Sequence, residues 1–176
     1  MRITQVQILL SLYGGASAAR AEAIATALRS EGLLPKGGRG PYAPEGSTEE
    51  IVRFAFAAAA APRVADAVEV AALATELVDH DGVSLSTALV DAISDEKRAF
   101  GIRRMVAVVT VPMAEIEERG GTSRFFFKRA MWEAPNFNPT AQGQGFAGLA
   151  GYLGGAVLVQ LAIQLHDDEF TGGYEE

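Results

Sequence analysis

The sequence predicts an α+β protein, because two different residue patterns follow each other along the chain. Over residues 3–94, apolar residues recur three and four positions apart between capping signals, which is the spacing of amphipathic helices. Near residue 95 the pattern changes to β-branched and aromatic runs separated by glycines, which favours strands and a tight turn. We therefore expect a helical domain at 1–94, a small antiparallel sheet at 95–132, and a loop with a C-terminal helix at 133–176.

Five helices are expected in the first segment. Ser17 can cap the second helix, because a serine oxygen accepts from the free amides of the first turn, and Gly32 suits the left-handed residue that ends it. Ser47 and Glu50 form a capping-box sequence at the start of the third helix. The expected spans are 3–13, 17–32, 47–61, 63–79 and a short helix that begins at Ser84 or Ser86.

The sheet is expected from two β-branched or half-polar runs and one aromatic run. Strands at 103–111, 114–118 and 123–128 are predicted, with Gly120-Gly121 as the hairpin turn between the last two. Phe125 and Phe127 are expected to face the core. The alternative is that aromatics and arginines on this sheet stack unpaired bases.

The segment at 146–165 holds about twenty residues without a charge, which by length could span a bilayer. Gln160, Gln164 and several glycines count against insertion, so a packed helix and no membrane partner are expected. Small residues spaced four apart would let another helix approach closely, which predicts a homo-oligomer through the Gly143–Gly155 helix. These small residues are Gly143, Ala147, Gly151 and Gly155.

Composition limits the possible functions. The 176 residues contain no cysteine, which excludes disulfides, thiolate catalysis and cysteine metal sites and fits a cytoplasmic protein. The net charge is −7, yet residues 1–44 carry +3 and the rest of the chain −10. Such asymmetry is typical of a protein with one end that faces phosphate.

The basic end is built around a helix and a glycine-rich loop, SAARAEAIATALRSEGLLPKGGRGPYAP at 17–44. An apolar face at Ala21, Ile24, Ala25 and Leu28 leaves polar residues on the other side of the helix. The loop then places Lys36 and Arg39 among glycines, where the backbone can approach a phosphate closely. An ordinary connection between two helices, with solvated charges, is the alternative.

The helix, the "LRSEGLL" turn and the basic loop together resemble the recognition helix and wing of winged-helix DNA-binding proteins. The resemblance implies that Thr26, Arg29 and Ser30 face the major groove while Lys36 and Arg39 touch phosphate. Only one helix precedes the segment, where that family has two, and Pro41 and Pro44 interrupt the expected wing strand. The nucleic-acid-binding residues predicted in this way are Arg20, Thr26, Arg29, Ser30, Lys36 and Arg39.

Two histidines lie beside carboxylates, His80 within 79–81 and His166 at the start of 166–169. Such groups could bind a metal or transfer protons, although histidine is also favourable at helix C-termini. No P-loop, nucleophile elbow or dinucleotide fingerprint is present in the sequence. We therefore expect no enzyme, no cofactor and no metal site.

The leading hypothesis is a DNA-binding regulatory protein. The "GLLPKGGRG…AP" junction before a capped helix is also similar in style to small prophage-encoded proteins, which implies a phage or mobile-element regulator. One alternative is an acidic inhibitor that binds a host nucleic-acid-handling complex, because residues 45–176 are strongly negative. The other is a structural virion or assembly subunit.

Overall fold

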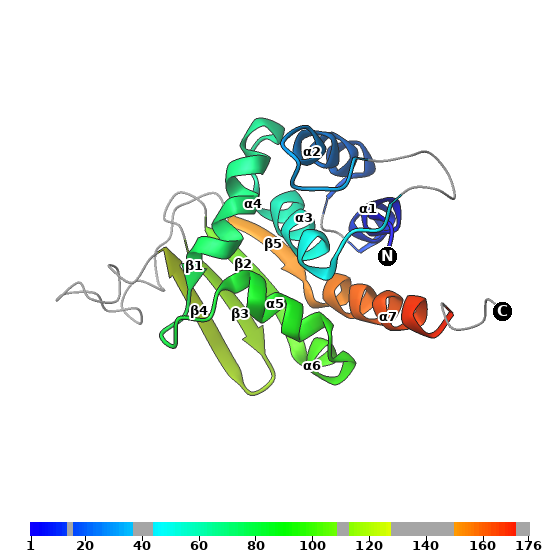
Figure 1. The fold of residues 1–176 in the computed structure, drawn as a ribbon. Coiled ribbons are helices and arrows are strands. Elements are labelled where there is room, and N and C mark those ends of the chain that lie inside the picture. The colour runs from blue at the N-terminus through cyan, green and yellow to red at the C-terminus, as the bar shows by residue number, and fades with distance from the viewer. Residues whose placement is uncertain (14–15, 37–43, 109–112, 128–149, 172–176) are drawn as a thin grey trace.

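A five-stranded antiparallel sheet carries the helices of this protein on one face (Figure 1). The computed structural model describes residues 1–13, 16–36, 44–108, 113–127 and 150–171. The strand order is β1-β4-β3-β2-β5. The strands are β1 (Leu77–Val78), β2 (Ile102–Val108), β3 (Met113–Glu118), β4 (Gly121–Phe127) and β5 (Ala150–Gly154).

Helices from both halves of the chain pack over this sheet. Helices α3 and α7 contact β5, and α7 also lies along β2, while α1 and α2 form an outer layer against α3 (Figure 1). The helices are α1 (Ile3–Leu12), α2 (Ala18–Ser30), α3 (Thr48–Ala60), α4 (Ala67–Glu76), α5 (Leu85–Ile93), α6 (Glu96–Gly101) and α7 (Gly155–Thr171), with a 3₁₀ turn η2 (Val64–Asp66). The predicted α+β class is confirmed. None of the described helices is long and apolar enough to cross a membrane.

The capping signals are confirmed in detail. Ser17 Oγ accepts from the Arg20 amide at 3.3 Å. Ser47 and Glu50 complete a reciprocal capping box, in which the Ser47 amide donates to Glu50 Oε2 at 2.7 Å. Gly32 has a φ of 74°, as a left-handed helix end requires. These helix boundaries are therefore set by local chemistry.

The face of the sheet that the helices cover is apolar, whereas the other face carries charged residues and, at the start of β3 and the end of β4, the buried Met113 and Phe126. Because successive side chains in a strand alternate between faces, Met105, Ile116 and Phe125 enter the core while Glu115 and Glu117 point outward. The inward position of Phe125 confirms that prediction; the side chain of Phe127 lies outside the described residues. Buried residues from helices and strands form one continuous core cluster.

Two of the expected helices are wrong over part of their length. The span predicted at 63–79 contains η2, then α4, and ends in strand β1, because Leu77 and Val78 pair with Phe127 and Phe126. The span predicted at 146–165 contains strand β5 at 150–154, which pairs with β2, and the helix begins only at Gly155. In both cases pairing with a distant strand overrides the local apolar pattern.

The small residues of that span do not form the predicted helix stripe. Gly151 lies in β5, and Gly155 packs against the backbone of β2, where a Cβ atom would overlap the Ile102 carbonyl oxygen and lie 2.9 Å from that of Arg103. The small size of Gly155 is therefore required inside the chain. Gly143 and Ala147 lie outside the described residues.

Smaller differences concern the ends of elements. The hairpin turn is formed by Arg119 and Gly120, since Glu118 pairs with Gly121, so the predicted Gly120-Gly121 turn is shifted by one residue. Helix α6, capped by Asp95, was not expected. Residues 109–111 of the first predicted strand and Gly14-Gly15 after the first helix lie outside the described residues.

Candidate nucleic-acid interface

Helix α2 presents a polar face to solvent because its apolar face is fully used. Ala21, Ile24, Ala25 and Leu28 are at most 1% exposed and pack against α1 and α3. On the other side, Thr26 and Ser30 are exposed, and Ser30 Oγ donates to the Ala27 carbonyl at 2.7 Å. The single hydroxyl proton of Ser30 is thus already used, and Ser30 can donate to an external acceptor only when it turns away from the Ala27 carbonyl.

The chain turns sharply after α2. The Leu33 amide donates to the Leu28 carbonyl at 2.9 Å and the Gly32 amide to the Arg29 carbonyl at 3.2 Å, which is the Schellman pattern. Leu34 then returns to the core, and Lys36 lies exposed beyond it. Lys36 is therefore an exposed cation six residues after the end of α2. Arg39 lies outside the described residues.

Arg29 is held by a carboxylate of its own helix. Its Nη1 lies 3.9 Å from Glu22 Oε1, at the limit of an ion pair. The other Glu22 oxygen accepts from Gln7 Nε2 of α1 at 2.6 Å. Because the ion pair is long and Glu22 is 61% exposed, Arg29 can exchange Glu22 for an external anion at little cost.

Arg20, predicted to bind nucleic acid, points toward α3 and not toward solvent. Its guanidinium donates to the carbonyls of Ala58, at 3.4 Å, and Ala61, and thereby satisfies the C-terminal end of α3. The side chain is half-buried between the two helices. Arg20 thus joins α2 to α3, and the cations left for the candidate interface are the half-buried Arg29 and the exposed Lys36.

The sequence contained signals for the packing role of Arg20 and for the pairing of Arg29 with Glu22. Arg20 stands one and four positions before the buried residues Ala21 and Ile24, so it borders the apolar stripe. Glu22 shares a helix face with Thr26 and Arg29, at four and seven positions' distance. A carboxylate on the same face as a candidate phosphate ligand is a signal for internal pairing.

A second cation near α2 is also paired. Arg63, just before η2, donates from Nε and Nη2 to both carboxylate oxygens of Asp66, at 2.9 and 2.7 Å. These hydrogen bonds and the opposite charge hold the pKa of Asp66 below its ordinary value of 3.8 and raise that of Arg63. The Arg63–Asp66 pair lies near α2, since η2 contacts α2. Because its two charges cancel, it adds no net positive charge beside the candidate interface.

The two histidine clusters lie in different parts of the fold. His80 belongs to the turn between β1 and α5, where its Nε2 lies 3.2 Å from Asp81 Oδ2. Asp79 has its carboxylate within 4.8 Å of these groups, but its Oδ1 accepts from the amides of Asp81 and Val83 at 2.9 Å and so shapes the turn. The conformation of the turn thus accounts for the closeness of Asp79, His80 and Asp81.

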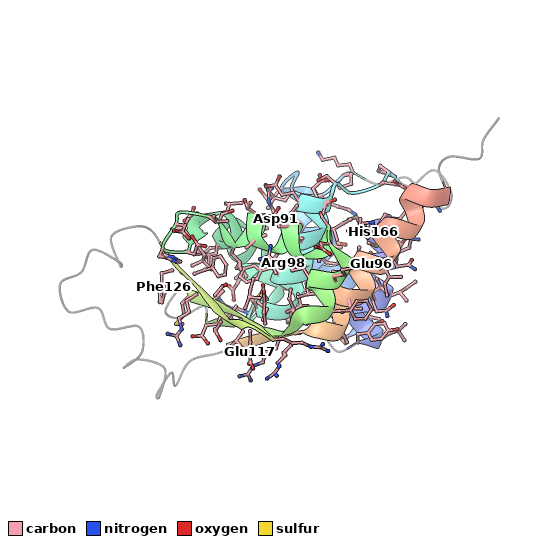
Figure 2. All side chains as sticks on the ribbon, turned by 90° about the horizontal axis from the view of Figure 1, so that it is seen from below. Asp91, Glu96, Arg98, Glu117, Phe126 and His166 are labelled. Atoms are coloured by element: carbon pink, nitrogen blue, oxygen red, sulfur yellow. The ribbon has the colours of Figure 1, made fainter. Side chains whose placement is uncertain are left out.

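His166 lies on α7 next to α6, close to Glu96 (Figure 2). It lines an open depression of about 670 Å³ together with residues 94–97. Asp95 of this group already accepts from the amides of Lys97 and Arg98 as the cap of α6. The depression thus combines one histidine with mixed charges and a carboxylate engaged in capping.

Comparison with known proteins adds no assignment: no protein-family model, curated protein or solved structure matches this chain.

Proposed function

We propose that this protein is a DNA-binding regulatory protein that contacts the nucleic-acid backbone through the outward face of α2 and the start of the following loop. The contacting residues are Thr26, Arg29, Ser30 and Lys36. The two cations and the exposed Thr26 hydroxyl are suitable donors to phosphate oxygens, and Ser30 becomes one when its hydroxyl turns away from the Ala27 carbonyl. Such contacts position a protein on DNA. The observation that carries the proposal is the exposed polar face of α2, which α1 and α3 leave uncovered.

The proposed interface contains fewer residues than the set predicted from the sequence. Arg20 is assigned to packing, because its donors are engaged by the α3 carbonyls. Glu22 is added as an internal competitor that occupies Arg29 in the free protein. When DNA binds, Arg29 exchanges its ion pair with Glu22 for a contact with a phosphate. The affinity for DNA is therefore reduced by the free energy needed to break the Arg29–Glu22 pair.

The acidic-inhibitor alternative receives less support. Glu115, Glu117 and Glu118 of β3 are each paired with an arginine, at 2.7, 2.7 and 3.4 Å. These carboxylates are therefore largely neutralised and do not present an unbroken negative surface.

Fluorescence anisotropy with a randomised duplex at low salt tests the proposal. Arg29→Ala and Lys36→Ala are each expected to weaken binding several-fold and to reduce the slope of log K against log salt by about 1. Arg103→Ala is the matched control, because this 65% exposed arginine lies on β2 and outside α2. Glu22→Gln is expected to tighten binding, since the glutamine oxygen still accepts from Gln7 while Arg29 is released.

The proposal fails if the wild-type protein does not shift the anisotropy of any duplex at low salt. It also fails if Arg29→Ala and Lys36→Ala bind as tightly as Arg103→Ala. Circular dichroism and thermal unfolding of each variant separate lost binding from lost folding.

A further inference from the structure

Two consecutive arginines of β2 lie exposed on the sheet because the strand contains an irregularity. The register between β2 and β3 shifts by one residue just before Arg104, which lies opposite Glu117. Arg103 therefore has no opposite residue of its own, as in a β-bulge. Strict alternation would place Arg103 on the same face as the buried Met105. The bulge instead leaves the side chains of Arg103 and Arg104 65% and 57% exposed.

Both arginines contact the same carboxylate. Arg104 Nε donates to Glu117 Oε2 at 2.7 Å, and Arg103 Nη1 lies 3.5 Å from Glu117 Oε1. A guanidinium has five N–H donors, and the structure shows no other acceptor for these two groups among the residues that it describes. One carboxylate balances one of the two positive charges. The pair therefore keeps both a surplus charge and donors that a ligand can reach.

Arg119 adds a third cation at this end of the sheet. Its backbone amide donates to the Gly101 carbonyl at 3.0 Å, which places the turn after β3 beside the start of β2. Its side chain is exposed and makes no ion pair with any residue in the described part of the chain. The neighbouring Glu118 is paired with Arg98 at 3.4 Å. Three arginines thus remain for one carboxylate, a surplus of two positive charges in a chain whose net charge is −7.

A surplus of two charges matches a doubly charged oxyanion. Guanidinium groups bind phosphate through parallel N–H···O hydrogen bonds. A phosphate monoester carries a charge of about −1.5 to −2 at neutral pH and three acceptor oxygens, whereas each phosphodiester of DNA carries a single charge. Because both guanidiniums are more than half exposed, they would bind the phosphate group itself at the surface without enclosing the rest of the ligand.

We propose that Arg103, Arg104 and Arg119 form a binding site for a phosphate monoester, and that Glu117 is the internal anion that holds the two β2 guanidiniums in the free protein. The phosphate can belong to a small molecule or to a phosphorylated side chain of another protein. Glu117 points away from the helices (Figure 2), while α2 lies in the outer helix layer on the other face of the sheet (Figure 1). The site is therefore separate from the proposed DNA interface.

NMR titration of the Nε–Hε signals of Arg103 and Arg104 tests this site. The probes are inorganic phosphate and a phosphoserine peptide, added to the full chain at about pH 7 and constant ionic strength, with the serine peptide as the unphosphorylated control. Both phosphate probes are expected to shift the two signals and to saturate at concentrations on the order of 1 mM. Tighter binding of the phosphopeptide identifies a protein source, and equal or weaker binding identifies a small molecule.

Four variants locate the binding. Arg104→Gln is expected to weaken phosphate binding at least about fivefold, because a charged fork is lost. Arg119→Gln is expected to weaken it about threefold and breaks no ion pair between described residues, so it tests the site without loss of a native contact. Glu117→Gln is expected to tighten binding, because the competing charge is removed. Arg124→Gln is the matched control, since this arginine has Glu115 as its own partner at 2.7 Å.

Two results overturn the site. One is that neither phosphate probe shifts the Arg103 and Arg104 signals. The other is that Arg124→Gln weakens binding as much as Arg104→Gln and Arg119→Gln, which would show only a general attraction to positive surface. Thermal unfolding of each variant separates lost binding from lost folding. Arg29→Ala is expected to leave phosphate binding unchanged, so this proposal and the DNA-binding proposal fail independently.

Discussion

The outer face of the sheet and the outer face of α2 both combine arginine with glutamate, but they arrange these charges differently. On the sheet, Arg124 lies opposite Glu115 and Arg104 opposite Glu117, and both ion pairs measure 2.7 Å. Glu117 lies on the side of the sheet away from the helices (Figure 2). On α2, Arg29 reaches back seven residues to Glu22, at 3.9 Å.

The difference is a matter of backbone geometry. Residues directly opposite each other in antiparallel strands have their side chains about 5 Å apart, so opposite charges meet without extending. Seven residues along a helix correspond to a rise of about 10 Å, which the side chains must span. Charge pairs on the sheet are therefore compatible with its register without strain, while the pair on α2 leaves an arginine ready to exchange its partner. The content of arginine in a segment does not by itself indicate a ligand surface.

The largest expected effect is the loss of stability when a side chain is added where α7 meets the sheet. Gly155→Val would place a side chain into the carbonyl groups of Ile102 and Arg103 on β2, and we expect a loss of about 3 kcal/mol or more of unfolding free energy. Urea denaturation measures it. Gly101→Ala is the control, because a Cβ there meets no atom within 4 Å, and an equal loss in both variants would contradict the role of the close approach at Gly155.

The next effect separates the two arginines of α2. Arg20→Gln is expected to cost about 1.5–3 kcal/mol of stability, because the carbonyls at the end of α3 lose charged donors. Arg29→Gln is expected to change stability by less than about 0.5 kcal/mol, since its ion pair is long and its partner Glu22 is 61% exposed. Thermal unfolding of both variants gives the comparison, and a larger loss for Arg29→Gln would reverse our assignment of the two residues.

A charge reversal tests the pairing on the sheet. Arg124→Glu and Glu115→Arg are each expected to destabilise the protein by about 0.5–1 kcal/mol, because like charges then lie directly opposite each other. The double variant restores the opposite charges and is expected to recover most of the loss. A double-mutant cycle from urea denaturation measures the coupling, and additive losses would show that the ion pair contributes nothing to the sheet.

The smallest effect concerns the pair beside α2. Because the hydrogen bonds and charge of Arg63 lower the pKa of Asp66, the pair adds stability above the ordinary pKa of 3.8 and loses it as the pH falls through the folded-state value. Arg63→Gln is expected to return the pKa of Asp66 toward 3.8, as measured by NMR titration of its carboxyl carbon. Its small stability deficit should vanish at low pH, and an unchanged Asp66 titration would contradict the pairing.

Local chemistry made part of this fold predictable. The caps at Ser17 and Ser47 and the left-handed Gly32 depend on a few consecutive residues, and each was found where the sequence placed it. The β3–β4 hairpin was predicted within one residue of its turn for the same reason. At the candidate site, the buried face of α2 was predicted correctly, because a helical period sorts apolar residues to one side, whereas Arg20, expected on the outward side, is half-buried against α3. The partners of Arg20 and Arg29 were not predicted.

What the sequence determined by itself, then, are the features in which neighbouring residues satisfy one another: the capped helix starts at Ser17 and Ser47, the helix end at Gly32, the hairpin, the apolar face of α2 and the α+β class. Tertiary structure alone decided three others. It made 150–154 a strand, because β2 offered unpaired backbone groups. It ended α4 in β1 through pairing with β4. It also assigned Arg20 to the end of α3, 38 residues away. In each case the hydrogen-bond partner lies far along the chain, where no local pattern can specify it.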